Sequence, residues 1–334
     1  MAALPSTAAA HVRWFVPEWL RLQPPDFGLI AAWPTLAVIG ASLVLFLGLR
    51  LLRRLVGSPH WPNPPLLAYM EPCATALLAV HTGISLVWFA YQRNLFVPQL
   101  VLPPNLLGWL LVGLQVFVAF TLITGLFDRA GALLLVVVFL LGFLLFPPLA
   151  MLSQLHYVGI AVALFVLGRT VPPEWVARKL AWVSQYETEA VAALRIFTGL
   201  SLVVAAFDEK LLAPELGRAF LAQYPHFNFM RSVFGFEWFD DDLFVTAAGI
   251  AEATIGVLLI TGVLTRVVIL GMWVPFNLTV PLLPPVELLG HLPIFGIMYV
   301  LLLYGSGIPP RAAVRLLEPA IRGEMAEARR RFQG

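Results

Sequence analysis

Charge and cysteine are both scarce in this sequence. Only 12% of its 334 residues are charged, 60% are hydrophobic and the mean hydropathy is +0.87, whereas a soluble domain carries about 25% charged residues. The single cysteine, Cys73, excludes an intramolecular disulfide, a paired-thiol redox couple and a cysteine-rich metal cluster. The sequence also lacks a glycine-rich nucleotide loop and a basic, aromatic surface for nucleic acid. We therefore expect an integral membrane protein that contacts lipid and has no nucleic-acid partner.

Long apolar runs predict transmembrane helices. A helix needs roughly 20 apolar residues to cross a bilayer, and nine segments of the chain come near that length. The predicted fold is therefore an all-α integral membrane protein with about nine spans. We place these spans at residues 28–52, 66–92, 105–127, 130–146, 149–168, 188–207, 242–263, 266–283 and 287–305.

The chain contains an internal duplication. Residues 122–160 align without a gap to residues 259–297 with 16 of 39 positions identical, and residues 76–100 align to residues 192–216 with 11 of 25 identical. Glycine, proline, threonine and arginine stand in register, which shared leucine alone would not produce. Each copy has four predicted helices, an even number, so both copies enter the membrane from the same side as parallel repeats.

The duplication defines the domain organisation. One extra transmembrane helix precedes two duplicated four-helix bundles, of which the first is the degenerate copy. The predicted units are an N-terminal segment with the first helix (1–65), the first repeat (66–170), a cytoplasmic linker (171–187), the second repeat (188–305) and a basic cytoplasmic tail (306–334).

Two segments fall outside the repeat pattern. Residues 11–22 carry Trp14 and Trp19 among charged residues, which is typical of a segment at the membrane interface, although a disordered tail has the same composition. The early and late blocks are offset by 116 and 137 residues, so an aromatic insertion of 21 residues lies at about 217–241. We expect this insertion to form either a helical lid on the outer face or a solvated loop.

Basic residues predict the orientation. If the first helix runs from outside to inside, 15 of the Lys and Arg residues fall in the cytoplasm and 6 fall outside. This distribution follows the positive-inside rule. The sequence therefore predicts a multi-pass protein of the inner (plasma) membrane, with its N-terminus outside and its C-terminus in the cytoplasm.

The two copies have diverged in polarity, which locates the candidate site. Five positions are uncharged in the first copy: Ala79, Asn94, Gln115, Ala150 and Gln154. The aligned positions of the second copy are Arg195, Lys210, Glu252, Glu287 and His291. The second copy is therefore the one expected to carry chemistry.

Glu252 is predicted near the bilayer centre. A carboxylate there costs at least about 2.5 kcal/mol even on insertion-based scales, so it should face the bundle interior and have a partner. The functional interpretation is a catalytic proton relay or a hydrogen-bond partner for a quinone carbonyl. The alternative is a structural hydrogen bond between helices, which Gln115 supplies in the first copy.

Glu287 and His291 stand four residues apart in the last predicted helix. This spacing allows an acid–imidazole contact and a catalytic proton shuttle. Two ligands do not complete a metal site, so we expect no metal. Asn277 is expected to join the same polar cluster as a substrate-binding residue. His81 and His156 of the first copy have no acidic neighbour at helical spacing and are expected to be packing or interface residues.

Three further charged residues are candidates for substrate binding. Arg195 lies about two turns into the sixth helix, where it pairs with Glu189, reaches a buried acid or simply anchors the helix in the cytoplasmic interface. Asp208 and Lys210 end the same helix on the outer side. They either pair with each other, frame the mouth of a polar cavity or form an ordinary exposed cluster.

The second copy resembles the DoxX family of four-helix membrane proteins over about residues 188–305. The resemblance rests on Arg195, Gly199, Lys210, Glu252, Gly262 and Arg266. The first copy keeps Gly83, Gly125 and Arg129 of this pattern, and the tandem arrangement departs from the usual single unit. The resemblance implies a membrane subunit linked to redox systems, such as thiosulfate:quinone oxidoreductases.

These features together predict a polar cavity in the second bundle, open to the outer face. Its expected lining is Glu252, Asn277, Glu287, His291 and Lys210. The leading hypothesis is a subunit of a quinone-linked redox complex, with a hydrophobic substrate, quinone as the implied cofactor and a redox partner protein. One alternative is a transporter or lipid-binding protein, which parallel repeats and an acidic residue near the bilayer centre would also suit. The other is an assembly subunit without chemistry.

Overall fold

The computed structural model describes residues 12–21, 24–56, 70–168, 181–280, 282–283 and 285–306. Over these ranges the chain is all-helical, with one isolated β-bridge between Asn94 and Val101. The predicted tail after residue 306 and most of the predicted linker lie outside the described residues. The main helices are α2 (Trp33–Val56), α4 (Ala74–Tyr91), α5 (Leu106–Thr124), α6 (Asp128–Gly142), α8 (His156–Leu167), α10 (Glu187–Ala206), α13 (Asp241–Thr261), α14 (Thr265–Thr279) and α15 (Pro285–Tyr304).

Shorter helical elements connect these helices. They are η1 (Val12–Trp14), α1 (Glu18–Arg21), η2 (Phe27–Ala31), η3 (Glu71–Cys73), α7 (Pro148–Leu152), η4 (Ala181–Tyr186), η5 (Phe207–Leu211), α11 (Pro214–Gln223), η6 (Pro225–Phe227) and α12 (Phe229–Ser232). The predicted insertion therefore contains helical turns, from the end of α11 to the start of α13.

Among the described helices, six are long and apolar enough to cross a membrane. They are α2, α4, α5, α10 with its flanking turns, α13 and α15, and they make the chain a multi-pass membrane protein in contact with lipid. Three predicted spans are shorter: α6 and α14 have 15 residues each and α8 has 12. A helix of that length covers about 22 Å or less, whereas the hydrocarbon core is about 30 Å thick.

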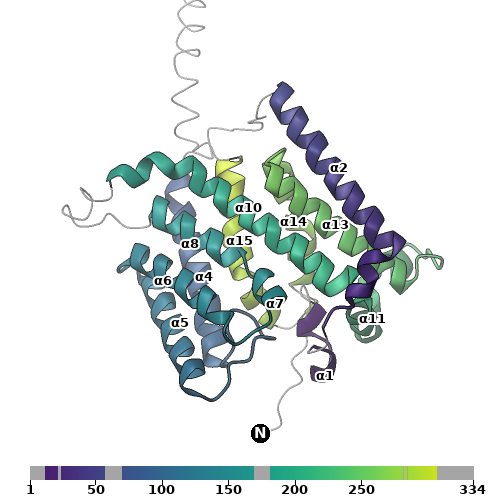
Figure 1. Cartoon of the computed structure of the whole chain (residues 1–334), viewed down its shortest axis with the longest axis horizontal. Helices are drawn as coiled ribbons and strands as arrows, with labels where there is room; N and C mark the ends of the chain where they lie inside the picture. The colour runs from purple at the N-terminus through teal and green to yellow at the C-terminus, as the bar shows by residue number, and fades with distance from the viewer. Residues whose placement is uncertain are drawn as a thin grey trace, which may run out of the picture.

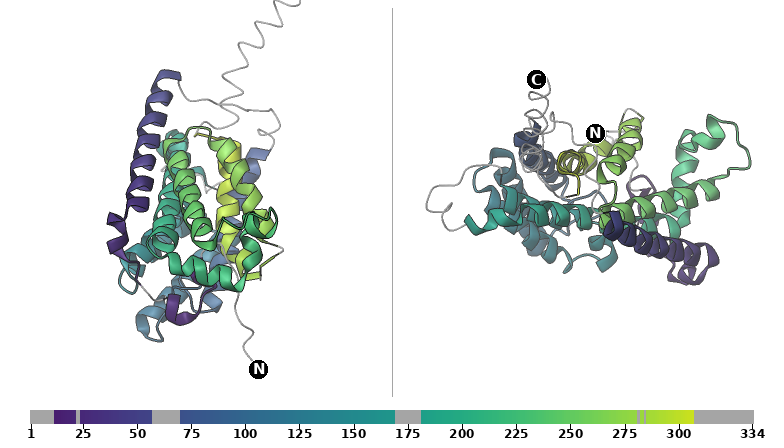
Figure 2. Two further views of the ribbon diagram at one scale, coloured as in Figure 1. Left: turned by 90° about the vertical axis from the view of Figure 1, so that its right-hand side faces the viewer. Right: turned by 90° about the horizontal axis from the view of Figure 1, so that it is seen from above.

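The helices contact one another in the same order in both copies. In the first copy α4 packs on α5, α5 on α6 and α6 on α8, and in the second copy α10 packs on α13, α13 on α14 and α14 on α15 (Figure 1). The last helix of each copy packs on the first helix of the other, α8 on α10 and α15 on α4, which closes a cycle of eight helices. Helix α2 lies outside this cycle against α13 (Figure 2).

The turns repeat the duplication in backbone conformation. Helices α5 and α13 each end before a left-handed glycine, Gly125 at φ 79° and Gly262 at φ 71°. Two residues later, Phe127 at φ 56° and Leu264 at φ 55° precede the next helix of each copy. Both pairs are separated by the 137 residues of the sequence alignment, so the aligned segments fold alike.

Small residues allow the first two helices of each copy to pack closely. A Cβ on Gly199 would lie 2.5 Å from the carbonyl oxygen of Gly256, and a Cβ on Gly83 would lie 3.1 Å from the carbonyl oxygen of Ala119. These two contacts are equivalent in the alignment. Close backbone approach at small residues is a common way for helices to associate in lipid.

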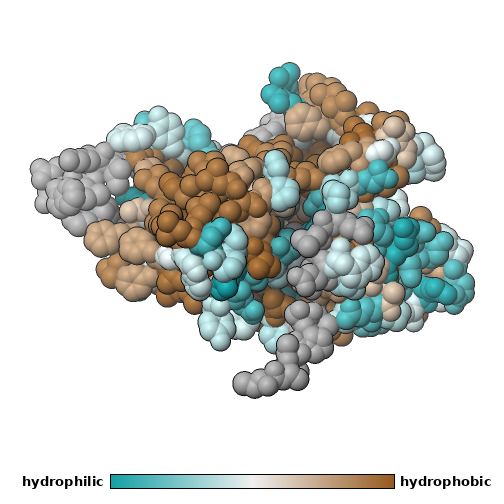
Figure 3. Space-filling model, turned by 60° about the horizontal axis from the view of Figure 1, so that its bottom comes forward, coloured by the Kyte–Doolittle hydropathy of each residue, from teal (hydrophilic) through white to brown (hydrophobic). Residues whose placement is uncertain are grey.

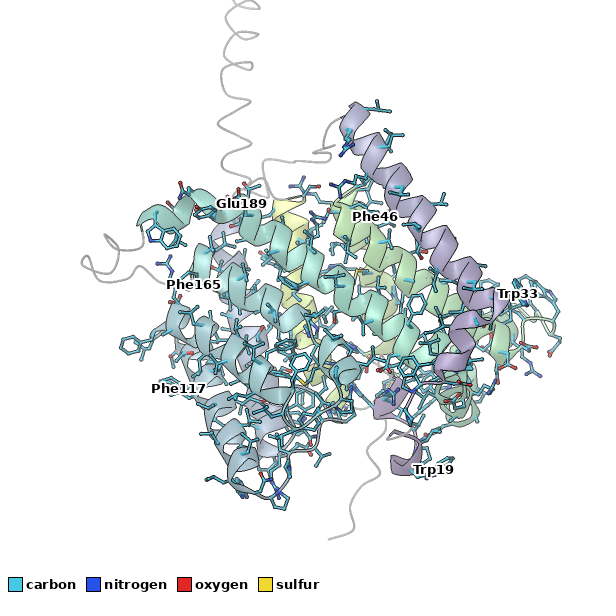
Figure 4. All side chains as sticks on the ribbon, in the orientation of Figure 1. Trp19, Trp33, Phe46, Phe117, Phe165 and Glu189 are labelled. Atoms are coloured by element: carbon cyan, nitrogen blue, oxygen red, sulfur yellow. The ribbon has the colours of Figure 1, made fainter. Side chains whose placement is uncertain are left out.

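Residues 12–16 of the N-terminal segment are buried within the protein. Residues 12–16 are each only 1–7% exposed, and the ring of Phe15 lies 6.2 Å from that of Phe220 in α11. This burial contradicts the alternative of a disordered tail for these residues, whereas their level relative to the membrane interface stays a prediction. Trp19, by contrast, is 67% exposed and projects at the lower edge in Figure 4.

Apolar side chains cover broad areas of the outer surface (Figure 3). Trp33 and Val44 of α2 are 80% and 71% exposed, and Phe117 of α5 is 52% exposed and points away from the helices (Figure 4). Large exposed apolar patches mark sites of interaction with membranes or other proteins, so these faces of apolar helices indicate contact with lipid.

Candidate ligand cavity in the second repeat

A cavity of about 510 Å³ lies within the second copy. Its walls come from α10, α13, α14 and α15, together with His156 of α8 and Phe229, Met230 and Phe239 of the insertion. Most lining side chains are apolar, and a few polar groups such as Glu252 interrupt them. An apolar chamber with few polar groups is the usual form of a small-molecule site.

Small side chains create this space. The cavity is lined by Ala205, Ala247, Ala248 and Ala251. The aligned residues of the first copy are Phe89, Leu110, Leu111 and Leu114. The replacement of large apolar residues by alanine can be read from the alignment of the two copies. A comparison of their polar positions alone does not detect it.

Glu252 and Lys210 form an ion pair at the cavity wall. Lys210 Nζ lies 2.8 Å from Oε1 and 2.8 Å from Oε2 of Glu252. The Lys210 side chain is 10% exposed, whereas that of Glu252 is 29% exposed and lines the cavity. The partner that a carboxylate at this depth requires is therefore supplied by the end of the neighbouring helix.

Gln115 makes the equivalent connection in the first copy without charge. Its Nε2 donates to the carbonyl oxygens of Leu86 and Asn94 at 3.0 and 3.1 Å, and its Oε1 accepts from the Phe96 N–H at 3.3 Å. Asn94 aligns with Lys210. In both copies a side chain of the second helix (α5 or α13) therefore bonds to the first helix (α4 or α10) or to the residues just after it. Only in the second copy is this bond made between a cation and a carboxylate.

A π-helical turn, η5, directs neighbouring charged residues to different partners. Such turns are rare and frequently occur at functional sites. Asp208 Oδ1 accepts a hydrogen bond from Arg13 Nη2 at 3.0 Å, while Lys210 reaches Glu252. Asp208, Glu209 and Lys210 are all at most 9% exposed, so the alternative of an ordinary exposed cluster is wrong.

His291 is fixed in the cavity wall by three neighbours. Its Nδ1 lies 3.2 Å from Oε1 of the fully buried Glu287, as the four-residue spacing predicts. Its ring stacks on Trp14 at 5.3 Å between centroids and meets Phe276 edge-on at 4.9 Å. A Cβ on Gly290 would lie 2.4 Å from the Trp14 ring, so this glycine makes room for the indole.

His156 lines the cavity, whereas its sequence context predicted a packing or interface residue. Its Nδ1 lies 3.0 Å from Ser201 Oγ, and that hydroxyl donates to the carbonyl oxygen of Ser153. Because the single hydroxyl proton is used there, His156 Nδ1 acts as the donor to Ser201. His156 comes from the first copy and Ser201 from the second, so both copies build the site; sequence spacing within one helix carries no signal of this.

Arg195 lies away from the cavity and caps a helix. It donates to carbonyls in the last turn of α13, including Ile260 at 2.8 Å, and Arg266 likewise donates to Leu302 and Leu303 of α15 at 2.8 and 2.7 Å. Cations at helix C-termini satisfy the last carbonyls and complement the helix dipole. The position of Arg195 therefore indicates a structural role rather than the expected contact with substrate.

Asn277 does not join the polar cluster. Its side chain is exposed and its Nδ2 donates to the Trp273 carbonyl oxygen of its own helix at 2.8 Å. The aligned residue of the first copy, Leu140, is 58% exposed, so helical periodicity turns this position outward in both copies. Within the described part of the chain, no three His, Cys, Asp or Glu side chains are grouped to hold a metal ion.

Comparison with protein-family models, curated proteins and solved structures finds no match to this chain. The fold and the cavity therefore define its class by themselves. It is a multi-pass helical membrane protein with an apolar cavity that carries an ion pair.

Proposed function

We propose that this protein binds a hydrophobic small molecule in the cavity of the second repeat. The observation that carries the proposal is the pairing of alanine-lined space with the Glu252–Lys210 ion pair, at a place where the first repeat has leucine and phenylalanine. Apolar cavities do not retain water well, and an intramembrane charge is a functional-site hypothesis by default. A ligand with an apolar body and a polar end would fill the apolar space and also contact the ion pair.

The specific form of the proposal is a subunit of a quinone-linked redox complex. The DoxX resemblance favours it, and the apolar walls fit the ring of a quinone or of its reduced quinol, with hydrogen-bonding groups at His156 and His291 and with Glu252 as an acceptor for a quinol hydroxyl. A bound quinone would supply two-electron chemistry coupled to proton transfer. In this role Glu252 and His291 would hold the protons that such a reaction exchanges, Glu287 would orient His291, and Lys210 would orient Glu252. A redox partner protein would supply or accept the electrons.

The proposal includes a topology. We propose nine spans in the inner (plasma) membrane, in which the turns and short helices beside α6, α8 and α14 complete the three shorter spans. They are arranged as α2 plus two four-helix bundles related by a pseudo-two-fold axis along the membrane normal. The cyclic order of helix contacts supports the pseudo-symmetry. The distribution of 15 against 6 basic residues supports an outer position for the insertion and a cytoplasmic C-terminus.

Extraction of apolar molecules from the purified protein tests this function. Ala205→Phe is the matched control, because the first copy carries Phe89 at the aligned position and tolerates its volume. We expect a small molecule to be enriched in the wild type over the control. An isoprenoid quinone supports the redox role, a phospholipid favours the lipid-binding alternative, and equal extracts from both proteins contradict the proposed cavity function.

A further inference from the structure

The first repeat fills its interior with a side chain of its own. Phe96, in the loop between α4 and α5, is fully buried. Its ring stacks on Tyr157 with centroids 4.4 Å apart and lies 6.5 Å from the ring of Phe139. Its backbone N–H donates to Gln115 Oε1 at 3.3 Å. Three helices, α5, α6 and α8, thus contact the ring and the backbone N–H of Phe96.

The three residues that hold Phe96 align with three residues of the cavity wall. With the offset of 137, Gln115 corresponds to Glu252, Phe139 to Phe276 and Tyr157 to Ile294. Glu252, Phe276 and Ile294 all line the cavity, from α13, α14 and α15 respectively. The place of the Phe96 ring in the first repeat therefore corresponds to open space in the second.

The loop conformation explains why the second repeat leaves this place open. Phe96 has a φ of 63°, a conformation that is unfavourable for a bulky side chain and persists only where packing enforces it. The residue aligned with Phe96 is Leu212, which has an ordinary φ of −105° and does not line the cavity. The π-helical turn η5 immediately precedes Leu212, whereas no such turn precedes Phe96 in the described part of the chain.

We propose that the ligand of the second repeat is a planar aromatic compound whose hydrogen-bond donor meets Glu252, bound as Phe96 is bound in the first repeat. This inference rests on the proposed function and specifies its ligand class. The ligand ring lies against Phe276, where aromatic rings prefer offset or edge contacts. A hydroxyl or N–H group on the ring takes the place of the Phe96 N–H and donates to the carboxylate, a charge-assisted hydrogen bond.

Three related probes test the ligand class on the whole protein in nanodiscs: 4-butylphenol, 4-butylanisole and 4-butylcyclohexanol. The phenol should bind tightest. The anisole lacks the donor and should bind at least about tenfold more weakly, and the cyclohexanol lacks the flat ring and should bind about threefold more weakly or worse. Equal affinities that are all lost in Ala205→Phe would overturn this inference and leave the proposed cavity function standing.

Three substitutions provide the second test: two place a residue of the first repeat at the aligned position of the second, and one removes the Phe96 ring from the first repeat. Glu252→Gln should bind the phenol more weakly than the wild type does, because an amide oxygen still accepts the donor but without the charge of the carboxylate, whereas Ala251→Leu should abolish binding. Phe96→Ala should open a second site in the first repeat and raise the stoichiometry from one phenol to two. A folded Phe96→Ala protein that still binds one phenol would contradict the inference, and the three-probe comparison decides the matter if that variant does not fold.

Discussion

Trp14 stacks on His291 with ring centroids 5.3 Å apart, which joins the N-terminal segment to the cavity wall. The adjacent Arg13 pairs with Asp208 on the π-helical turn that also carries Lys210. Arg13 and Trp14 thus contact η5, which carries Lys210, and α15, which carries His291. The N-terminal segment is therefore part of the framework of the site.

Replacement of Trp14 by alanine should destabilise the protein strongly. The indole is 2% exposed, and truncation of a buried large side chain costs about 3–5 kcal/mol. Thermal unfolding of the purified protein measures the effect. Trp19→Ala is the control, because Trp19 is 67% exposed and its loss should change stability by roughly 0.5 kcal/mol or less. Equal losses in both variants would show that the segment does not pack as described.

The Arg13–Asp208 pair should behave as a buried ion pair. Arg13→Gln leaves the Asp208 carboxylate buried without its cation, which costs about 3–5 kcal/mol. The double variant Arg13→Gln with Asp208→Asn removes both charges and should recover most of that loss in the same unfolding assay. A double variant that is as unstable as the sum of the two single variants would contradict a direct pair.

The duplication and its register were predictable from the sequence. Thr124-Gly125 and Thr261-Gly262 mark two helix ends that need a left-handed residue, and they indicate equivalent turns without a structure. The contact between Glu287 and His291 was predictable for a similar reason, because spacing along one helix is a local property.

The composition of the site was not predictable in the same way. Arg13 and Asp208 meet only through the tertiary fold, and no local pattern connects the N-terminal segment with the end of α10. The π-helical turn has no reliable sequence signature, so the sequence alone leaves a direct pair between Asp208 and Lys210 open. Asn277 was misplaced because a polar residue in an apolar helix suggests an interior position, whereas its own helix carbonyl satisfies it on the outer face.

Glu252→Gln and His291→Gln should impair the proposed quinone-linked activity while preserving the fold. The first copy already carries Gln115 and Gln154 at these positions, but a neutral amide does not transfer protons. Loss of a proton-transfer group typically lowers a rate by about 10²–10⁴-fold, so quinone reduction by membranes of the host should fall accordingly. Full activity in both variants would assign these residues a structural role. Failure of Glu252→Gln to accumulate in the membrane would show that Glu252 serves packing.

The proposed orientation places Ser232 outside and Ser184 in the cytoplasm. Both residues are exposed, so each position can be converted to cysteine after replacement of Cys73. An impermeant thiol reagent applied to intact cells should label position 232 and not position 184, and membrane permeabilisation should make position 184 reactive. Labelling of position 184 alone in intact cells would reverse the orientation and the interpretation of the basic residues.

A density map of the protein purified in nanodiscs with 4-butylphenol tests the central claim most directly. The account predicts ring-shaped density between Glu252, Phe276 and Ile294 in the second repeat, and the Phe96 side chain in the corresponding place between Gln115, Phe139 and Tyr157 in the first. A cavity closed by side chains of the second repeat, or density for the phenol only among lipids at the outer surface, would contradict it.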